Sequence, residues 1–409
     1  MSDATDLELR DRAKKVIPSG MWGHLHVARQ PVGYPQYFVR GEGCRIWDAN
    51  GREYIDFMCS YGPIVLGHHD PDVDRAAAAQ AVAGDCLNGP APVLVDLAEL
   101  MVETVPHADW ATFQKNGTDA MQACVMIARA GTGRRKLLVA RKAYHGAALW
   151  CTPSQAGVLP EDRTHQIFYD YNDVASLEAA AAEAGDDLAG VLVTAIRHDL
   201  GRDHEMPTPA FAAAARRICD RTGAALILDD VRASFRLDVG GSWELVGVRP
   251  DLAGYSKAIG NGHPLAAVTG SERFRDAGAR IFVTGSFWCA AVPMAAAIAT
   301  IRKLKEIDGP ARMRAAGERL RAGLAAQAAA HGVAIRQSGP PQMPLVLFED
   351  DADVAKGSAF CLEALKHGVY LHPVHTMFLS TAHGDAEIDR ALEGTDRAFR
   401  AVAERFGHD

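Results

Sequence analysis

The sequence lacks the features that mark secreted, membrane-spanning and nucleic-acid-binding proteins. Its eight cysteines are scattered without a C-x-x-C pair, which indicates reduced thiols rather than disulfides or a zinc site. No run of about 18 apolar residues occurs, and the charged N-terminal stretch has no apolar core, so we expect neither a membrane span nor a signal peptide. A net charge of −8 without a long basic block argues against binding to nucleic acid. We therefore expect a cytoplasmic protein that contacts neither membranes nor nucleic acids.

The central part of the chain alternates short apolar segments with alanine-rich helical ones. Three segments are apolar throughout and as short as strands: KLLVA (136–140), GVLVTAI (190–196) and AALILDD (224–230). Residues 174–184 and 209–223 have the composition of helices, and each ends near a glycine. Strands that are apolar on both faces and separated by helices predict an α/β fold with a mostly parallel sheet that helices cover.

Both ends of the chain have a different pattern from the centre. Residues 43–57 predict a hairpin that turns at Asn50 and Gly51, a dipeptide that tolerates positive φ angles. A long helical pattern starts near residue 290, and a strand-like segment follows at 343–350. We therefore expect a large central domain and a small α+β domain built from both chain ends, divided as 1–60, 61–300 and 301–409.

Two motifs in the central region suggest places for a ligand. Asp229 and Asp230 follow a buried strand, and ligands of open α/β sheets bind beyond the carboxyl ends of strands. The same pair can also simply cap a loop or the next helix. Gly117 and Thr118 open a predicted helix, whose free N–H groups accept a phosphate, although an ordinary N-cap has the same residues.

Two further residues add chemistry to these motifs. Tyr144 and the adjacent His145 follow a strand, where an aromatic ring either covers a planar ligand or fills a core corner. Lys257 lies among small residues in DLAGYSKAIGNGHP, either as a surface lysine or as an amine made nucleophilic by desolvation. Pyridoxal 5′-phosphate (PLP) requires this set of groups: a phosphate cradle, an aromatic ring, an aspartate at a strand end and a lysine. The chain carries them in that order.

With these motifs the chain resembles the class III PLP-dependent aminotransferases, and most of all glutamate-1-semialdehyde 2,1-aminomutase. The resemblance covers nearly the whole chain, including WDANGREYIDF, KNGTDAMQACVMIARAGTGRRKLL, AYHG, LILDDVRASFR and GVRPDLAGYSKAIGNGHPLAAVTG. It implies the fold type I of PLP-dependent transferases, with a seven-stranded sheet in the large domain. It also implies an obligate homodimer with shared active sites.

The resemblance assigns roles to individual residues. Lys257 would form the internal aldimine and later move a proton, Asp229 would pair with the pyridine nitrogen, and Val231 and Tyr144 would cover the two ring faces. A threonine or serine of the partner subunit would reach the phosphate, and Thr284 or Ser286 is at that place here. The implied catalytic residues are Lys257, Asp229 and Tyr144, and the implied cofactor-binding residues are Asn116, Gly117, Thr118, Tyr144, His145, Asp229, Val231, Lys257, Thr284 and Ser286.

Several departures from the family pattern surround the substrate. His26 stands where aminomutases have an arginine for the substrate carboxylate, and Tyr61 stands where a tryptophan is common. A glutamate after GVYLHP and a Glu-Pro pair after the third apolar strand are both missing. Arg29 and Arg197 are alternative carboxylate binders. The predicted substrate residues are His26, Arg29, Tyr61 and Arg197.

These departures predict a transaminase with an altered substrate pocket. The expected reaction moves an amino group from an amine or amino acid, including β- and ω-amino acids, to a keto or aldehyde acceptor by a ping-pong mechanism. An intramolecular aminomutase or racemase, and a non-catalytic PLP-binding regulatory protein, remain as alternatives. We expect no metal site, because histidine pairs such as His24 and His26 have no carboxylate or cysteine at a diagnostic interval.

Overall fold

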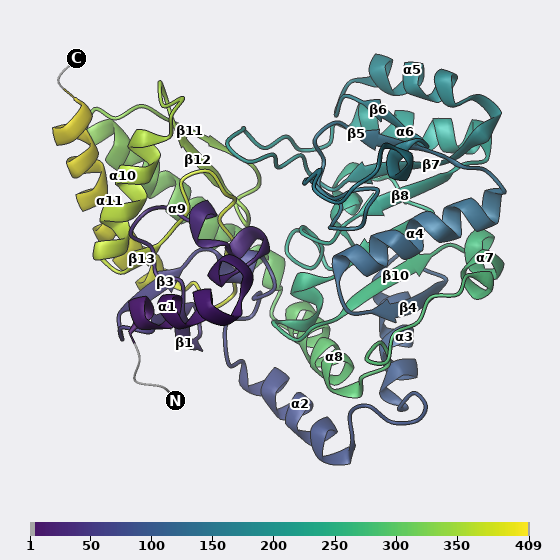
Figure 1. Ribbon diagram of the computed structural model, residues 1–409, viewed down its shortest axis with the longest axis horizontal. Helices are drawn as coiled ribbons and strands as arrows, with labels where there is room; N and C mark the ends of the chain where they lie inside the picture. The colour runs from purple at the N-terminus through teal and green to yellow at the C-terminus, as the bar shows by residue number, and fades with distance from the viewer. Residues whose placement is uncertain (1–4, 408–409) are drawn as a thin grey trace.

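The computed structural model describes residues 5–407, and its elements form two lobes (Figure 1). The lobe at the left holds the purple N-terminal and yellow C-terminal parts of the chain. The lobe at the right holds the blue, teal and green middle of the chain. Within residues 5–407, we find no helix whose length and apolar character would let it cross a bilayer.

A seven-stranded sheet forms the centre of the right-hand lobe. Its first strands, in spatial order, are β4 (Trp110–Gln114), β10 (Ala266–Gly270), β9 (Leu252–Tyr255) and β8 (Ala225–Asp229). The order continues through β7 (Leu188–Thr194), β5 (Lys136–Ala140) and β6 (Gln166–Tyr169). β10 is antiparallel to both of its neighbours, and the other pairs are parallel. The predicted mostly parallel sheet of seven strands is therefore confirmed.

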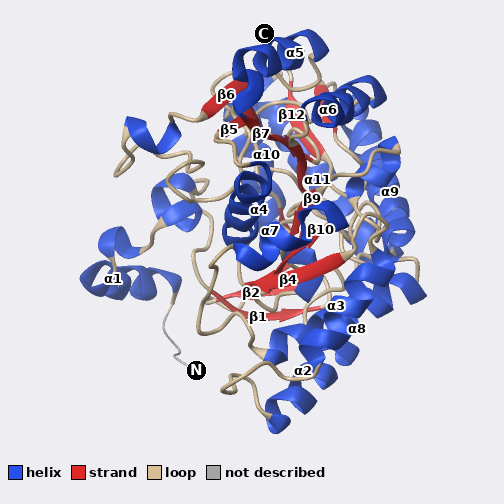
Figure 2. Ribbon diagram, turned by 90° about the vertical axis from the view of Figure 1, so that its right-hand side faces the viewer, coloured by secondary structure: helices blue, strands red, loops and turns tan. Residues whose placement is uncertain are grey.

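Helices cover both faces of this sheet, as its two-sided apolar strands require (Figure 2). On one face α4 (Gly117–Thr132) and α7 (Arg275–Arg280) pack against residues such as Leu137, Ile227 and Leu252. On the other face α5 (Val174–Ala184), α6 (Pro209–Thr222) and α8 (Ala291–Glu306) pack against residues such as Leu138, Leu228 and Ala253. Next to α8 lie two further helices, α2 (Pro71–Ala83) and α3 (Val93–Thr104).

A second sheet joins the two ends of the chain. It has the order β1 (Phe38–Glu42), β2 (Arg45–Asp48), β3 (Glu53–Asp56) and β13 (Val369–Tyr370). The β2–β3 hairpin forms around Asn50 and Gly51 as predicted, and Val369 pairs with Ile55 in parallel. The residue limits of the two domains stay a prediction. The same lobe contains β11 (Ile335–Ser338), β12 (Leu345–Phe348), α1 (Asp6–Val16), α9 (Gly309–Ala330), α10 (Ala355–Lys366) and α11 (Asp385–Phe406).

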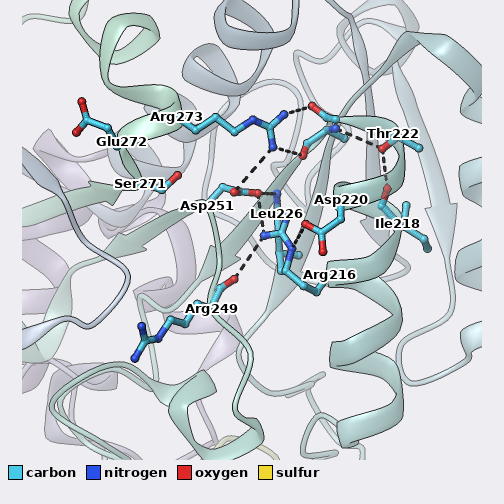
Figure 3. Close-up of polar contacts among 12 residues, drawn as sticks. Arg216, Ile218, Asp220, Thr222, Leu226, Arg249, Asp251, Ser271, Glu272 and Arg273 are labelled. Atoms are coloured by element: carbon cyan, nitrogen blue, oxygen red, sulfur yellow. Dashed lines mark hydrogen bonds and ion pairs between the residues drawn. The ribbon is translucent and has the colours of Figure 1, made fainter.

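Asp251 fixes the start of β9 relative to its neighbours (Figure 3). Its Oδ2 accepts hydrogen bonds from Leu226 N at 2.8 Å and from Arg216 Nη1 at 3.0 Å. Its backbone N–H and C=O bond to Leu226 O and Ser271 N, both at 2.9 Å. The side chain and backbone of Asp251 thus hold β8, β9 and the end of β10 in register. This register sets where β8 and β9 end at the opposite edge of the sheet.

Candidate active site

A cavity of about 400 Å³ opens where β8, β9 and α4 meet. Asp229 is the last residue of β8, Lys257 begins the 3₁₀ turn Lys257–Gly260 just after β9, and Gly117 is the first residue of α4. All three line the cavity, because the carboxyl ends of parallel strands and the N-termini of the following helices share one edge of the sheet. Sequence motifs far apart in the chain therefore meet in one place.

Lys257 has the environment of a reactive amine. Burial lowers the pKa of its amine well below the usual range, and the charge of Arg232 acts in the same direction, while Asp229 opposes it. Its stem lies against Gly62, where an added Cβ would come within 3.3 Å of Lys257 Cδ. The backbone φ of Lys257 is +51°, a left-handed conformation that non-glycine residues adopt at a cost and mainly at functional sites. A neutral amine here is a nucleophile and a proton acceptor.

Asp229 is held in a fixed orientation at the floor of the cavity. Its Oδ2 lies 2.6 Å from Nδ1 of the buried His145, and its Oδ1 accepts a hydrogen bond from Val231 N at 3.2 Å. Because a carboxylate can only accept, His145 Nδ1 carries the proton of this contact. These two contacts give the carboxyl group of Asp229 a defined direction in the cavity that it lines.

The N-terminus of α4 supplies an anion-binding wall. The first N–H groups of a helix have no intrahelical acceptor, and Asn116, Gly117 and Thr118 line the cavity at this point. Thr118 Oγ1 accepts a hydrogen bond from Ala147 N at 3.1 Å, which ties the loop after β5 to the helix. Lys115 also lines this wall; its Nζ is buried and has no hydrogen-bond partner among the described residues, and burial lowers its pKa.

Two glycines of this wall cannot carry side chains. A Cβ on Gly117 would come within 2.6 Å of Val231 Cγ1, so the absence of a side chain lets Val231 reach the cavity. Gly146 has a φ of +115°, and a Cβ there would overlap the Thr118 hydroxyl. Tyr144, two residues earlier, lines the cavity and is half exposed.

Imidazoles and one guanidinium contribute to the remaining wall. His24, His198 and Arg232 line the cavity. Tyr61 packs edge-on against His24 at 4.8 Å and against His375 at 5.1 Å between ring centroids. The sequence indicated His24 and singled out Tyr61, which contacts His24 but is not itself among the described residues that line the cavity. It missed Arg232, although Arg232 directly follows Val231, and it missed His198 in favour of its neighbour Arg197.

Several residues predicted for substrate or partner contacts lie outside this cavity. Arg197 is engaged by Asp199 at 3.0 Å and Glu205 at 2.7 Å, so its guanidinium is not available to a substrate there. The ring of His26 accepts a hydrogen bond from Ala28 N at 3.0 Å. The cavity wall does not include Arg29, Thr284 or Ser286, all of which are exposed in the described chain.

Comparison with known proteins agrees with this geometry. The family model "Aminotransferase class-III" matches residues 27–398. Aminopentol aminotransferase of Sphingopyxis macrogoltabida is 48% identical over 98% of this chain and 94% of that protein. Glutamate-1-semialdehyde 2,1-aminomutase of Desulforudis audaxviator (strain MP104C) is 31% identical over 95% of this chain and 96% of that protein.

Solved structures give the same result. The FumI protein of Sphingopyxis sp. MTA144, in its PLP internal aldimine form, superimposes with a TM-score of 0.97 at 48% identity, covering 98% of this chain and 97% of that chain. An omega-transaminase from Sphaerobacter thermophilus superimposes with a TM-score of 0.89 at 28% identity, covering 98% of each chain.

The chain belongs to the class III aminotransferases. It is a PLP-dependent aminotransferase, and the family, fold, enzyme class and cofactor predicted from the sequence are confirmed. Its substrates are small-molecule amino donors and acceptors. The residues present suit the cofactor: the α4 N-terminus and the unpartnered Lys115 Nζ fit a phosphate, and Asp229 fits a protonated ring nitrogen.

Proposed function

We propose that the enzyme transfers the amino group of a primary amine to a carbonyl acceptor in two half-reactions, with Lys257 and Asp229 as its catalytic residues. The observation that carries this proposal is the meeting of Lys257, Asp229 and the α4 N-terminus around one cavity of about 400 Å³. Such a cavity has the size of a site for a small cofactor and its substrate.

Each part of the cavity wall has a role toward the cofactor. PLP, when bound, supplies an aldehyde for the amine and a ring that takes up electrons from the reacting carbon. Asn116, Gly117, Thr118 and Lys115 would hold its phosphate at the α4 N-terminus. Asp229, oriented by His145, would pair with the ring nitrogen.

The remaining residues orient the ring and move protons. Val231 and Tyr144 would lie against the two ring faces, which keeps the reacting carbon beside Lys257. The Nζ of Lys257, whose pKa burial lowers well below its usual range, would accept a proton from the reacting carbon of the donor and return it later in the cycle. A residue that moves protons in this way is neutral when it accepts the proton and protonated when it returns the proton.

The donor that fits this wall best is a hydroxylated primary amine. His24 and His198 line the substrate side, and partial or full burial is the main cause that lowers their pKa values. Neutral imidazoles donate and accept hydrogen bonds, as hydroxyl groups require. A relative with 48% identity that is named for an aminopentol supports the same class of donor.

A donor panel tests this proposal. The PLP-loaded enzyme is mixed with hydroxylated amines, simple amines, β-amino acids and glutamate-1-semialdehyde, and its visible absorbance is followed in single turnover. We expect the fastest conversion with a hydroxylated amine, with release of the matching carbonyl compound. Turnover of glutamate-1-semialdehyde alone, without any acceptor, would instead identify an intramolecular aminomutase. Failure of every donor would support a cofactor-binding regulatory protein.

We further propose a cytoplasmic homodimer in which Thr284 or Ser286 reaches the phosphate site of the partner subunit. Both residues are exposed, and the exposed Phe282 and Phe287 beside them support coverage of this segment by another chain. The eight free cysteines support a reducing compartment.

Mixing two inactive homodimers tests the shared site. One carries Lys257→Ala, and the other carries Thr284→Ala together with Ser286→Ala. If the site is shared, one of the two sites in each hybrid dimer is intact, and activity returns to about a quarter of the wild-type level after subunit exchange. No recovery despite verified hybrids would contradict the shared site.

A further inference from the structure

Lysine and arginine side chains outnumber carboxylates in the wall of the active-site cavity. Of the described residues in its wall, Lys115, Arg232 and Lys257 are basic, and Asp229 is the single carboxylate. In the proposed site Lys115 serves the cofactor's phosphate and Lys257 reacts with amines. The guanidinium of Arg232 is therefore left for another anion.

Arg232 has little to bind within the protein. Among the described residues it makes one hydrogen bond, at 3.4 Å to Thr376 Oγ1, and its guanidinium lies 5.9 Å from the centroid of the Phe378 ring. A guanidinium carries several N–H donors in a planar fork that suits a carboxylate. The side chain lines the cavity, so these donors are accessible to a ligand there.

Two other arginines near the site, Arg236 and Arg197, are already engaged. Arg236 is fully buried and donates to Gly62 O at 2.7 Å, to Ile64 O at 3.1 Å and to Leu379 O. Arg197 is paired with two carboxylates outside the cavity wall. In contrast to these two arginines, Arg232 has donors to spare and lines the cavity.

The groups around Arg232 also favour an anion. Burial lowers the pKa of His198 well below its usual range, and lowers that of His375 to about 2, with Arg232 as a further cause for both. These rings stay neutral, and so does the half-exposed Tyr144, whose pKa burial raises. Among the described residues of the wall, Asp229 is the one carboxylate that could compete with a ligand for Arg232. Its two oxygens already contact His145 and Val231 N.

The position of the anion follows from the position of Lys257. Arg232 and Lys257 line the same cavity, and the charge of Arg232 lowers the pKa of the Lys257 amine. An anion on Arg232 therefore shares the cavity of about 400 Å³ with the carbon that reacts at Lys257. In a carbonyl acceptor, the group at this position would be a carboxylate attached directly to the carbonyl carbon.

We infer that Arg232 is the specificity-determining residue for the acceptor, binds its carboxylate through a bidentate contact, and selects 2-oxo acids over simple aldehydes and ketones. This inference rests on the proposed two-step transfer. It replaces Arg29 and Arg197 as the carboxylate-binding residue. It also means that the two half-reactions differ in their need for Arg232: the acceptor half-reaction requires its guanidinium, whereas a hydroxylated amine donor does not.

Pyruvate and acetaldehyde test the inference, because they differ by the carboxylate. Wild type, Arg232→Gln, Arg232→Lys and Arg197→Gln are converted to the amino form of the cofactor and mixed with each acceptor in single turnover. For Arg232→Gln we expect kcat/KM for pyruvate to fall about 100-fold, as for loss of a charge-assisted bidentate contact, and that for acetaldehyde to change less than about threefold. Arg232→Lys should recover part of the loss, since it keeps the charge without the fork.

Arg197→Gln is the matched control, and we expect it to keep the preference for pyruvate. Equal losses for both acceptors in Arg232→Gln, or loss of the preference in Arg197→Gln instead, would overturn the inference. If no amine converts the wild type, the proposed function fails, and binding still decides the inference. Propanoate, an unreactive carboxylate, is titrated calorimetrically into the PLP form. About tenfold weaker binding to Arg232→Gln supports the assignment, and equal binding contradicts it.

Discussion

Nδ1 of His145 lies 2.6 Å from Oδ2 of Asp229 at the floor of the cavity. Both side chains are nearly inaccessible, with 2% of His145 and 8% of Asp229 exposed. A short contact between a buried imidazole N–H and a carboxylate fixes the direction of the carboxylate, as in sites where a third group orients a catalytic one. The pair thus presents an oriented carboxyl group to whatever occupies the cavity that it lines.

Asp229→Asn should slow the donor half-reaction about 100-fold or more, because loss of a charge-assisted hydrogen bond of about 3 kcal/mol corresponds to that factor. The amide oxygen can still accept from His145, so we expect the cofactor to remain bound. Single-turnover absorbance measures the rate, and Asp220→Asn, at an exposed partner of Arg216, is the control. A variant that keeps the wild-type rate with full cofactor content would show that Asp229 is not catalytic.

Gly117→Ala should weaken PLP binding roughly tenfold, because the new methyl group would displace Val231 from the ring-binding wall. Absorbance titration of the apoprotein measures the dissociation constant. Gly89→Ala is the control, since a Cβ there meets no described atom within 4 Å. The melting temperature of the apo variant separates a local effect from a folding defect, and unchanged affinity in a folded variant argues against the assigned wall.

Asp230 predicts a dependence of stability on pH. Burial raises its pKa to about 7, whereas an unfolded chain has a value of about 4. As the pH rises through this window the unfolded state releases a proton that the folded state keeps, so the group lowers stability progressively and then by a constant amount above about pH 7.

Asp230→Asn removes this penalty and can still accept the hydrogen bond that Ser242 N donates at 2.8 Å. The melting temperature of the variant minus that of the wild type should therefore increase by roughly 3 °C or more between about pH 5 and about pH 8. Calorimetry at several pH values measures this difference, with Glu183→Gln on the exposed side of α5 as control. A difference that stays flat or falls with pH disagrees with a raised pKa.

Arg236 predicts a large effect on stability. It is fully buried, and Arg236→Met would leave the carbonyls of Gly62, Ile64 and Leu379 without their donor. Unpaired buried acceptors cost about 1–3 kcal/mol each, so we expect the melting temperature to fall by roughly 5 °C or more. Arg336→Gln, which removes exposed ion pairs with Asp203 and Glu349, should change it by less than about 2 °C. Similar small changes in both variants would contradict the structural role of Arg236.

The elements that sequence predicted well are those coded by contiguous residues. The strands at 136–140 and 225–229, the β2–β3 hairpin and the helix that opens at Gly117 each have a local pattern of apolar residues, turn residues or caps. Lys257 and Asp229 could be found because each follows directly on such a strand.

The substrate side was harder to predict because its wall combines loops from distant parts of the chain. At the end of β7 the choice between two neighbours depends on which side each faces. His198 lines the cavity, while Arg197 pairs with Glu205 across an isolated bridge. No local pattern in the sequence distinguishes the two. Arg232 was missed for a related reason. Whether its guanidinium has N–H donors left for a ligand depends on where Thr376 and Phe378 lie, and both are distant in the sequence.

The central claim is that the amine of Lys257 bonds covalently to the cofactor. Borohydride reduction of the PLP-loaded protein, followed by proteolysis and mass spectrometry, measures this directly. We expect one modified peptide, carrying the mass of reduced PLP on Lys257, and no such label in Lys257→Ala. Label on another lysine such as Lys115, or no label despite full cofactor content, would contradict the account.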